Sequence, residues 1–123
     1  VADVTDLLDA WSGADLAVVV DATRTGREPG TVAVSARAAG DGPLRARSGA
    51  PAGASSHSID LGEALRLARA IGSAPGNLVV VGVEGHDFRP GEGLSPAVQE
   101  AVPSAVRAVR RAVAEYRSTS TTA

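Results

Sequence analysis

The sequence predicts an α/β fold with three layers, in which helices flank a mainly parallel sheet. Two runs of consecutive apolar residues, 16–20 and 78–83, show no alternation, which is typical of strands buried on both faces. Helical periodicity appears before and after these runs, and strands that alternate with helices favour a layered α/β domain. The 123 residues suffice for a single α/β domain, which we assign to residues 1–117, followed by a polar tail at 118–123.

The composition excludes several function classes. Hydrophobic residues make up 44% of the chain, as in a globular protein, and the net charge of −2 gives no electrostatic reason to bind nucleic acid or an anionic membrane. The absence of cysteine excludes disulfides, thiolate zinc sites and cysteine nucleophiles. No apolar run reaches the ~20 residues that span a bilayer, and no signal peptide is visible. We therefore expect a cytoplasmic protein with neither a nucleic-acid nor a membrane partner.

The first half of the chain contains a helix, a strand, a shorter strand and a long loop. Apolar residues in Val4–Trp11 recur with helical spacing, and Gly13 follows where a helix end favours glycine. After the first apolar run, a loop at 22–30 leads to residues 31–37, which predict a half-exposed strand near a sheet edge. Residues 38–56 are rich in Gly, Pro, Ala and Ser, and loops of this length are often functional.

Two helices surround the second apolar run. Asp60 and Glu63 form a capping box for a helix that ends near Gly72. Ser95-Pro96 predicts the start of the last helix, and Pro103 predicts a kink or a restart within it. The valines at helical spacing are expected to face inward: Val102, Val106, Val109 and Val113.

Asp21 and His57 are the principal candidates for chemistry. Asp21 follows the first apolar strand, and ligands of open α/β sheets bind at the carboxyl ends of strands. A buried carboxylate is usually paired, ligating or catalytic, because an unpaired buried charge is costly, although capping of the next turn is an alternative. His57 ends the long loop; alone it fits a surface turn, but with Asp21 it offers donors for a divalent metal. We expect both side chains to share one metal ion, although catalytic metal sites usually have three protein ligands.

A serine hydrolase is a weaker interpretation of the same region. Ser55 and Ser56 stand beside His57, and Asp21 could complete a triad. No Gly-x-Ser-x-Gly motif is present, however, to expose and activate a serine nucleophile.

Two further groups of polar residues lie in loops. Glu84, His86 and Asp87 have a composition that suits a metal, but their spacing matches no helix-borne metal motif, so a solvated loop is the simpler interpretation. Arg24 and Arg27 could bind a carboxylate or a phosphate, although their loop lacks a phosphate-binding glycine pattern.

Several stretches, in the same order along the chain, resemble the hydrogenase maturation endopeptidases. The resemblance covers nearly the whole chain and implies a phosphorylase/hydrolase-like α/β fold. The matching stretches are Gly13-Ala14-Asp15-Leu16-Ala17-Val18-Val19-Val20-Asp21-Ala22 with Pro29-Gly30; Ser55-Ser56-His57 with Leu61; Val80-Val81-Gly82-Val83-Glu84; Gly93-Leu94-Ser95-Pro96 with Val98; and Ala101-Val102-Pro103.

The resemblance implies an activity, a partner and a metal. Members of the family remove a C-terminal peptide from the precursor of the nickel-iron hydrogenase large subunit after nickel insertion, so the substrate supplies the nickel and no resident cofactor is expected. The family binds nickel through an N-terminal acidic residue, an aspartate after the central strand, and a histidine. Asp21 and His57 match the second and third of these positions and would be both metal-binding and catalytic.

The family's opening strand, Gly-Asn turn and first acidic ligand have no counterpart in these 123 residues. Relative to the family, we therefore expect an N-terminally truncated fold. Two alternatives to a peptidase remain open at this point. One is a non-catalytic α/β module that binds a metalloprotein precursor, and the other is an unrelated small α/β domain in which Asp21 is structural.

Overall fold

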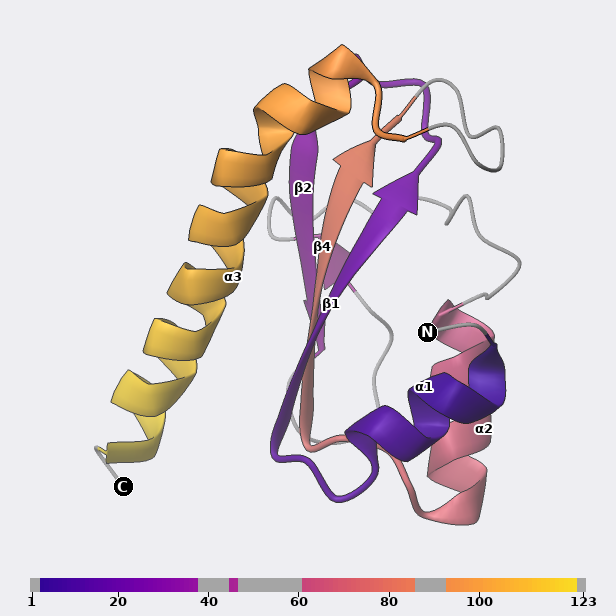
Figure 1. Cartoon of the computed structure of the whole chain (residues 1–123). Helices are drawn as coiled ribbons and strands as arrows, with labels where there is room; N and C mark the ends of the chain where they lie inside the picture. The colour runs from indigo at the N-terminus through magenta and orange to yellow at the C-terminus, as the bar shows by residue number, and fades with distance from the viewer. Residues whose placement is uncertain (1–2, 38–44, 47–60, 86–92, 122–123) are drawn as a thin grey trace.

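The chain folds into three layers, as the sequence predicts. Helix α3 (Pro96–Thr121) covers one face of the sheet, and α1 (Val4–Trp11) and α2 (Leu61–Ile71) cover the other (Figure 1). The α/β class with helices on both sides of the sheet is therefore confirmed. The computed structural model describes residues 3–37, 45–46, 61–85 and 93–121.

The sheet has four strands in the described residues, in the order β1-β4-β2-β3. Strands β1 (Leu16–Thr23) and β4 (Asn77–Glu84) are parallel, whereas β2 (Val32–Arg37) runs antiparallel to β4 and to β3 (Arg45–Ala46). The sheet is thus mixed, where the sequence predicted a mainly parallel one. The reason is the short connection at 24–31, because a parallel crossover needs a dozen or more residues.

Strand β4 is the centre of the sheet. Every residue from Leu78 to Glu84 is buried, as its unbroken apolar run predicts. Strand β1 has the same kind of sequence but lies at the edge of the described sheet, and Val20 is 56% exposed there. Burial on both faces therefore holds for β4 but not for the apolar run of β1, where residues 16–19 are half-buried and Val20 is exposed.

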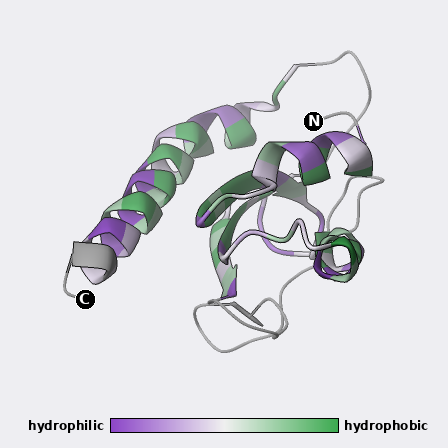
Figure 2. Ribbon diagram, turned by 90° about the horizontal axis from the view of Figure 1, so that it is seen from below, coloured by the Kyte–Doolittle hydropathy of each residue, from purple (hydrophilic) through white to green (hydrophobic). Residues whose placement is uncertain are grey.

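Alternate residues of the central strands pack into two separate cores. Ala17, Val19, Leu78 and Val80 contact the core formed with α1 and α2, which includes Leu65. Their neighbours along the strands contact α3 on the opposite face; these are Val18, Val81 and Val83. Figure 2 shows the strands coloured mainly as hydrophobic between the helices, and α3 alternating between hydrophobic and hydrophilic. By this alternation, odd-numbered positions of β1 and even-numbered positions of β4 face α1 and α2.

The helix ends lie where the capping residues predict them. The side chain of Asp3 caps α1, and Gly13 and Gly72, which follow α1 and α2, both have a φ of 76°. Ser95 precedes α3, and its hydroxyl accepts a hydrogen bond of 3.4 Å from the amide of Val98. Gly13, Gly72 and Ser95 thus mark helix ends that the sequence predicted, whereas the cap by Asp3 was not predicted.

Helix α3 differs from its prediction in three ways. It continues through Pro103, which the sequence marked as a kink or restart, and it reaches Thr121, four residues past the expected domain end at 117. Val102 and Val106, expected inward, are 43% and 41% exposed. Small side chains face the sheet instead, because they let the helix approach the β4 valines closely; they are Ala101, Ala105 and Ala112.

The long loop expected at 38–56 contains β3. The rest of that stretch lies outside the described residues, as does Asp60, the expected N-cap of α2. Among the helices that the structure describes, none combines the length and hydropathy needed to cross a membrane.

Gly30 docks the β1–β2 loop against the first turn of α3. Its φ is 90°, and a Cβ at this position would lie 2.8 Å from the carbonyl oxygen of Ala97. We expect Gly30→Ala to lower the free energy of unfolding by more than about 1 kcal/mol, because the new methyl group adds a collision to backbone strain. Urea denaturation measures this loss.

Gly26→Ala is the matched control in the same loop. Gly26 has a φ of 88°, but nothing lies within 4 Å of a Cβ placed there. This variant should therefore lose less stability than Gly30→Ala. Equal losses in the two variants would show that the contact with α3 contributes nothing.

Candidate functional site

Asp21 lies near the carboxyl end of β1, two residues before the strand ends, and only 9% of it is exposed. Its position in the strand places it on the face that α1 and α2 cover. The residue opposite it in β4 is Gly82, which in turn lies opposite Ala33 in β2. Across the sheet at this level, Asp21 is thus followed by a glycine and an alanine, the two smallest residues. This confirms a buried carboxylate near the strand end, the geometry that sequence reasoning expected of a ligand site.

Glu84 lies at the end of the neighbouring strand on the same face. Its carboxylate accepts hydrogen bonds from the amide of Thr25 at 2.8 Å on Oε2 and 3.1 Å on Oε1. The hydroxyl groups of Thr25 and Thr23 donate to Oε1 at 2.6 Å and 3.3 Å. A Cβ on Gly82 would come 2.9 Å from Cγ2 of Thr23, so the absence of a side chain there lets Thr23 reach Glu84. Glu84 is 2% exposed, and these donors satisfy its charge.

The hydrogen bonds set the protonation state of Glu84. Burial by itself raises the pKa of this carboxyl, but the hydrogen bonds from the Thr25 hydroxyl and amide, the Thr23 hydroxyl and the Gly26 amide together outweigh burial. The pKa of Glu84 therefore lies below its ordinary value of 4.5, and the group stays ionised at neutral pH.

The main chain of Glu84 joins the same elements. Its carbonyl oxygen accepts from the amide of Gly30 at 2.8 Å, and its amide donates to the carbonyl of Thr31 at 2.8 Å. The next amide, of Gly85, donates to the carbonyl of Thr23 at 3.0 Å. One residue therefore holds the end of β1 and both ends of the β1–β2 loop.

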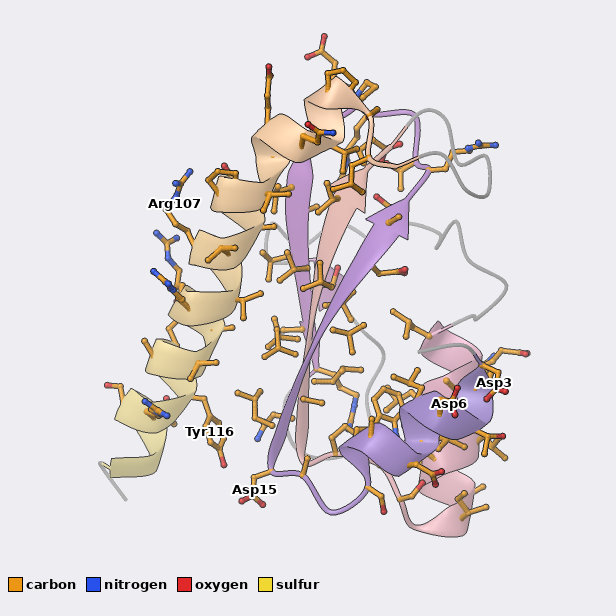
Figure 3. All side chains as sticks on the ribbon, in the orientation of Figure 1. Asp3, Asp6, Asp15, Arg107 and Tyr116 are labelled. Atoms are coloured by element: carbon orange, nitrogen blue, oxygen red, sulfur yellow. The ribbon has the colours of Figure 1, made fainter. Side chains whose placement is uncertain are left out.

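Three other acidic residues lie away from this edge. Asp3 and Asp6 lie at the start of α1, and Asp15 precedes β1 at the opposite end of the sheet (Figure 3). Within the described residues, no three His, Cys, Asp or Glu side chains form a group that could hold a metal ion.

The remaining sequence candidates divide into two sets. Arg24 and Arg27 are exposed in the β1–β2 loop. The others lie outside the described residues, so their roles stay predictions; they are Ser55, Ser56, His57, His86 and Asp87. His57 stands four residues before Leu61, the first residue of α2. Helix α2 runs in the direction opposite to β4. Its N-terminal end therefore faces the same side of the domain as the carboxyl ends of β1 and β4 (Figure 1).

Thr23 and Thr25 were not predicted from the sequence as residues of this site, and Glu84 was predicted to lie in a polar loop. Glu84 is the last residue of β4, and its oxygens are occupied by threonine donors rather than free for a metal. The arrangement follows from the strand register, which the sequence alone does not show. Two parallel strands of equal length end at Thr23 and Glu84, which pair, and a second hydroxyl follows two residues later.

The fold and this edge define a three-layer α/β domain with a buried carboxylate at a strand terminus. Two solved structures share the fold. The hydrogenase maturating endopeptidase HybD from E. coli aligns with a TM-score of 0.68 and 24% identity, over 91% of this chain and 66% of that chain. A solution structure of an endopeptidase from Escherichia coli aligns with a TM-score of 0.71 and 22% identity, over 94% and 68%. A comparison with curated proteins gives no significant match.

The family follows from the sequence match. Residues 2–112 match the family described as hydrogenase maturation protease, and the chain belongs to this family. The resemblance inferred from the residues is thereby confirmed. The chain spans 66% of the length of the HybD chain.

The lowered pKa of Glu84 predicts a pH-dependent contribution to stability. We expect Glu84→Gln to lower the free energy of unfolding by about 1.5–3 kcal/mol at neutral pH, because an amide cannot accept from every threonine donor. In the wild type this contribution is complete above 4.5, the ordinary pKa that the unfolded chain keeps, and is lost as the pH falls through the lower folded pKa.

Urea denaturation at a series of pH values tests this. The difference between wild type and Glu84→Gln should be largest at neutral pH and should shrink under acidic conditions. A difference that stays constant down to a pH of about 2 would show that the charge of Glu84 is not the stabilising feature.

Proposed function

We propose that the protein is an endopeptidase that removes the C-terminal peptide of a nickel-loaded precursor of a nickel-iron hydrogenase large subunit, in the cytoplasm. The observation that carries the proposal is the placement of Asp21. In a chain of the maturation protease family, a buried carboxylate lies near the carboxyl end of β1, on the face that α2 covers. His57 stands four residues before Leu61 in the sequence, and the proposal has its imidazole act at the same edge.

Asp21 and His57 would recognise the nickel of the substrate. A carboxylate and an imidazole are suitable donors for this ion, which the precursor supplies and which is not a resident cofactor of the protein. Binding at these side chains would place the scissile peptide bond next to the metal. Polarisation of its carbonyl or activation of a water molecule are the two routes of attack that a divalent ion supports.

The test is processing of a nickel-loaded precursor, followed as loss of the C-terminal mass by mass spectrometry. We expect Asp21→Ala and His57→Ala each to slow processing on the order of 100-fold or more, because each removes a group that stabilises charge at the reacting bond. Precursor without nickel should stay uncut.

Asp15→Ala is the control, since Asp15 is exposed at the opposite end of the same strand. The Asp15→Ala variant should process the nickel-loaded precursor at the wild-type rate. Processing that survives both Asp21→Ala and His57→Ala would overturn the mechanism. Stable binding of the precursor without any cleavage by the wild type would favour the alternative function, a non-catalytic module that binds the precursor.

A further inference from the structure

The end of β1 carries the proposed site but has little support from the sheet. In the described sheet β1 pairs only with β4, and Asp21 is two residues from the strand end. Ends of edge strands open readily, because few hydrogen bonds hold them. An anchor beyond residue 21 would therefore restrict the movement of the segment that carries Asp21.

Glu84 supplies such an anchor. The hydroxyl of Thr23 and the amide and hydroxyl of Thr25 all donate to its carboxylate, at distances from 2.6 to 3.3 Å. Thr23 lies two residues after Asp21 and projects from the same face of β1. The two threonines that follow Asp21 thus bind the central strand, Thr23 through its side chain and Thr25 through both its side chain and its backbone.

We propose that Glu84 is a positioning residue for Asp21, acting through Thr23 and Thr25; this role rests on the proposed function. Glu84 fixes the end of β1 so that the Asp21 carboxylate meets the substrate in one geometry. It does so without touching the substrate.

The hydrogen bonds also distinguish positioning from metal binding. Oε1 of Glu84 receives both threonine hydroxyls, and Oε2 receives the amide of Thr25. A carboxylate oxygen has two lone pairs, so the two hydroxyls use both lone pairs of Oε1, and a metal ion could bind this oxygen only by displacing a threonine donor. The arrangement therefore favours an anchor over a third metal ligand.

Thr25→Val and Thr25→Ser test the proposal as a matched pair. Valine removes the donor with the 2.6 Å contact and keeps the shape, whereas serine keeps the donor. With the nickel-loaded precursor and fully folded protein, Thr25→Val should lower kcat on the order of 10- to 100-fold and leave KM unchanged, because a displaced catalytic group affects the reacting geometry. Thr25→Ser should keep the wild-type kcat.

Hydrogen exchange gives a second measurement that does not depend on cleavage. The amides of residue 25 and Gly85 both donate across the end of β1, and both should exchange faster in Thr25→Val than in Thr25→Ser. Thr31→Val is the control in the same loop, since it removes a hydroxyl that donates to the carbonyl of Glu28 rather than to Glu84. It should change neither kcat nor these two exchange rates.

The outcomes separate the two proposals. Wild-type cleavage together with an unchanged kcat or unchanged exchange in Thr25→Val would overturn the positioning role and leave the proposed function intact. Failure of the wild type to cleave the precursor would overturn the proposed function and the positioning role with it.

Discussion

The carboxylate of Glu84 is the interaction on which the functional edge depends. It lies at the end of the central strand, 2% exposed, and accepts hydrogen bonds from the two threonines that follow Asp21. A buried charge is tolerated only where donors surround it, so the turn after β1 must fold around Glu84. The same residue fixes the β1–β2 loop through Gly30, and that loop in turn packs against α3. Through its carboxylate and its main chain, one residue thus connects the sheet, the loop and a helix on the other face.

The division of the sheet into two faces explains where chemistry can occur. One face at the strand ends is filled by valines that pack against α3. The other carries Asp21 and Glu84 beside Gly82, where side chains are small or polar. Of the two carboxylates, Glu84 accepts hydrogen bonds from the threonines, whereas Asp21 is the one that we propose for chemistry. The different surroundings of these two acidic residues are the basis of the different roles that we propose for them.

The sequence was sufficient to predict the features that depend on local chemistry. Unbroken apolar runs predicted β1 and β4, and Gly13, Gly72 and Ser95 marked helix ends. Features that depend on pairing could not be predicted in this way. The antiparallel direction of β2 and the exposure of Val20 follow from which strands are neighbours, which residue spacing does not encode. The same holds for Glu84, because its role requires Thr25, 59 positions away in the chain. Asp21 became a candidate because strand termini have a general chemical meaning, whereas an anchor for a loop has none in sequence.

The central claim is that Asp21 and His57 belong to one metal-binding site at the carboxyl edge of the sheet. A crystal structure of the protein grown with nickel(II), with anomalous diffraction recorded at the nickel edge, tests it most directly. The account predicts one nickel ion bound by the Asp21 carboxylate and the His57 imidazole, with bonds of ~2.0–2.2 Å, as for divalent ions with these donors. Nickel bound elsewhere, or the two side chains on opposite sides of the domain, would contradict it.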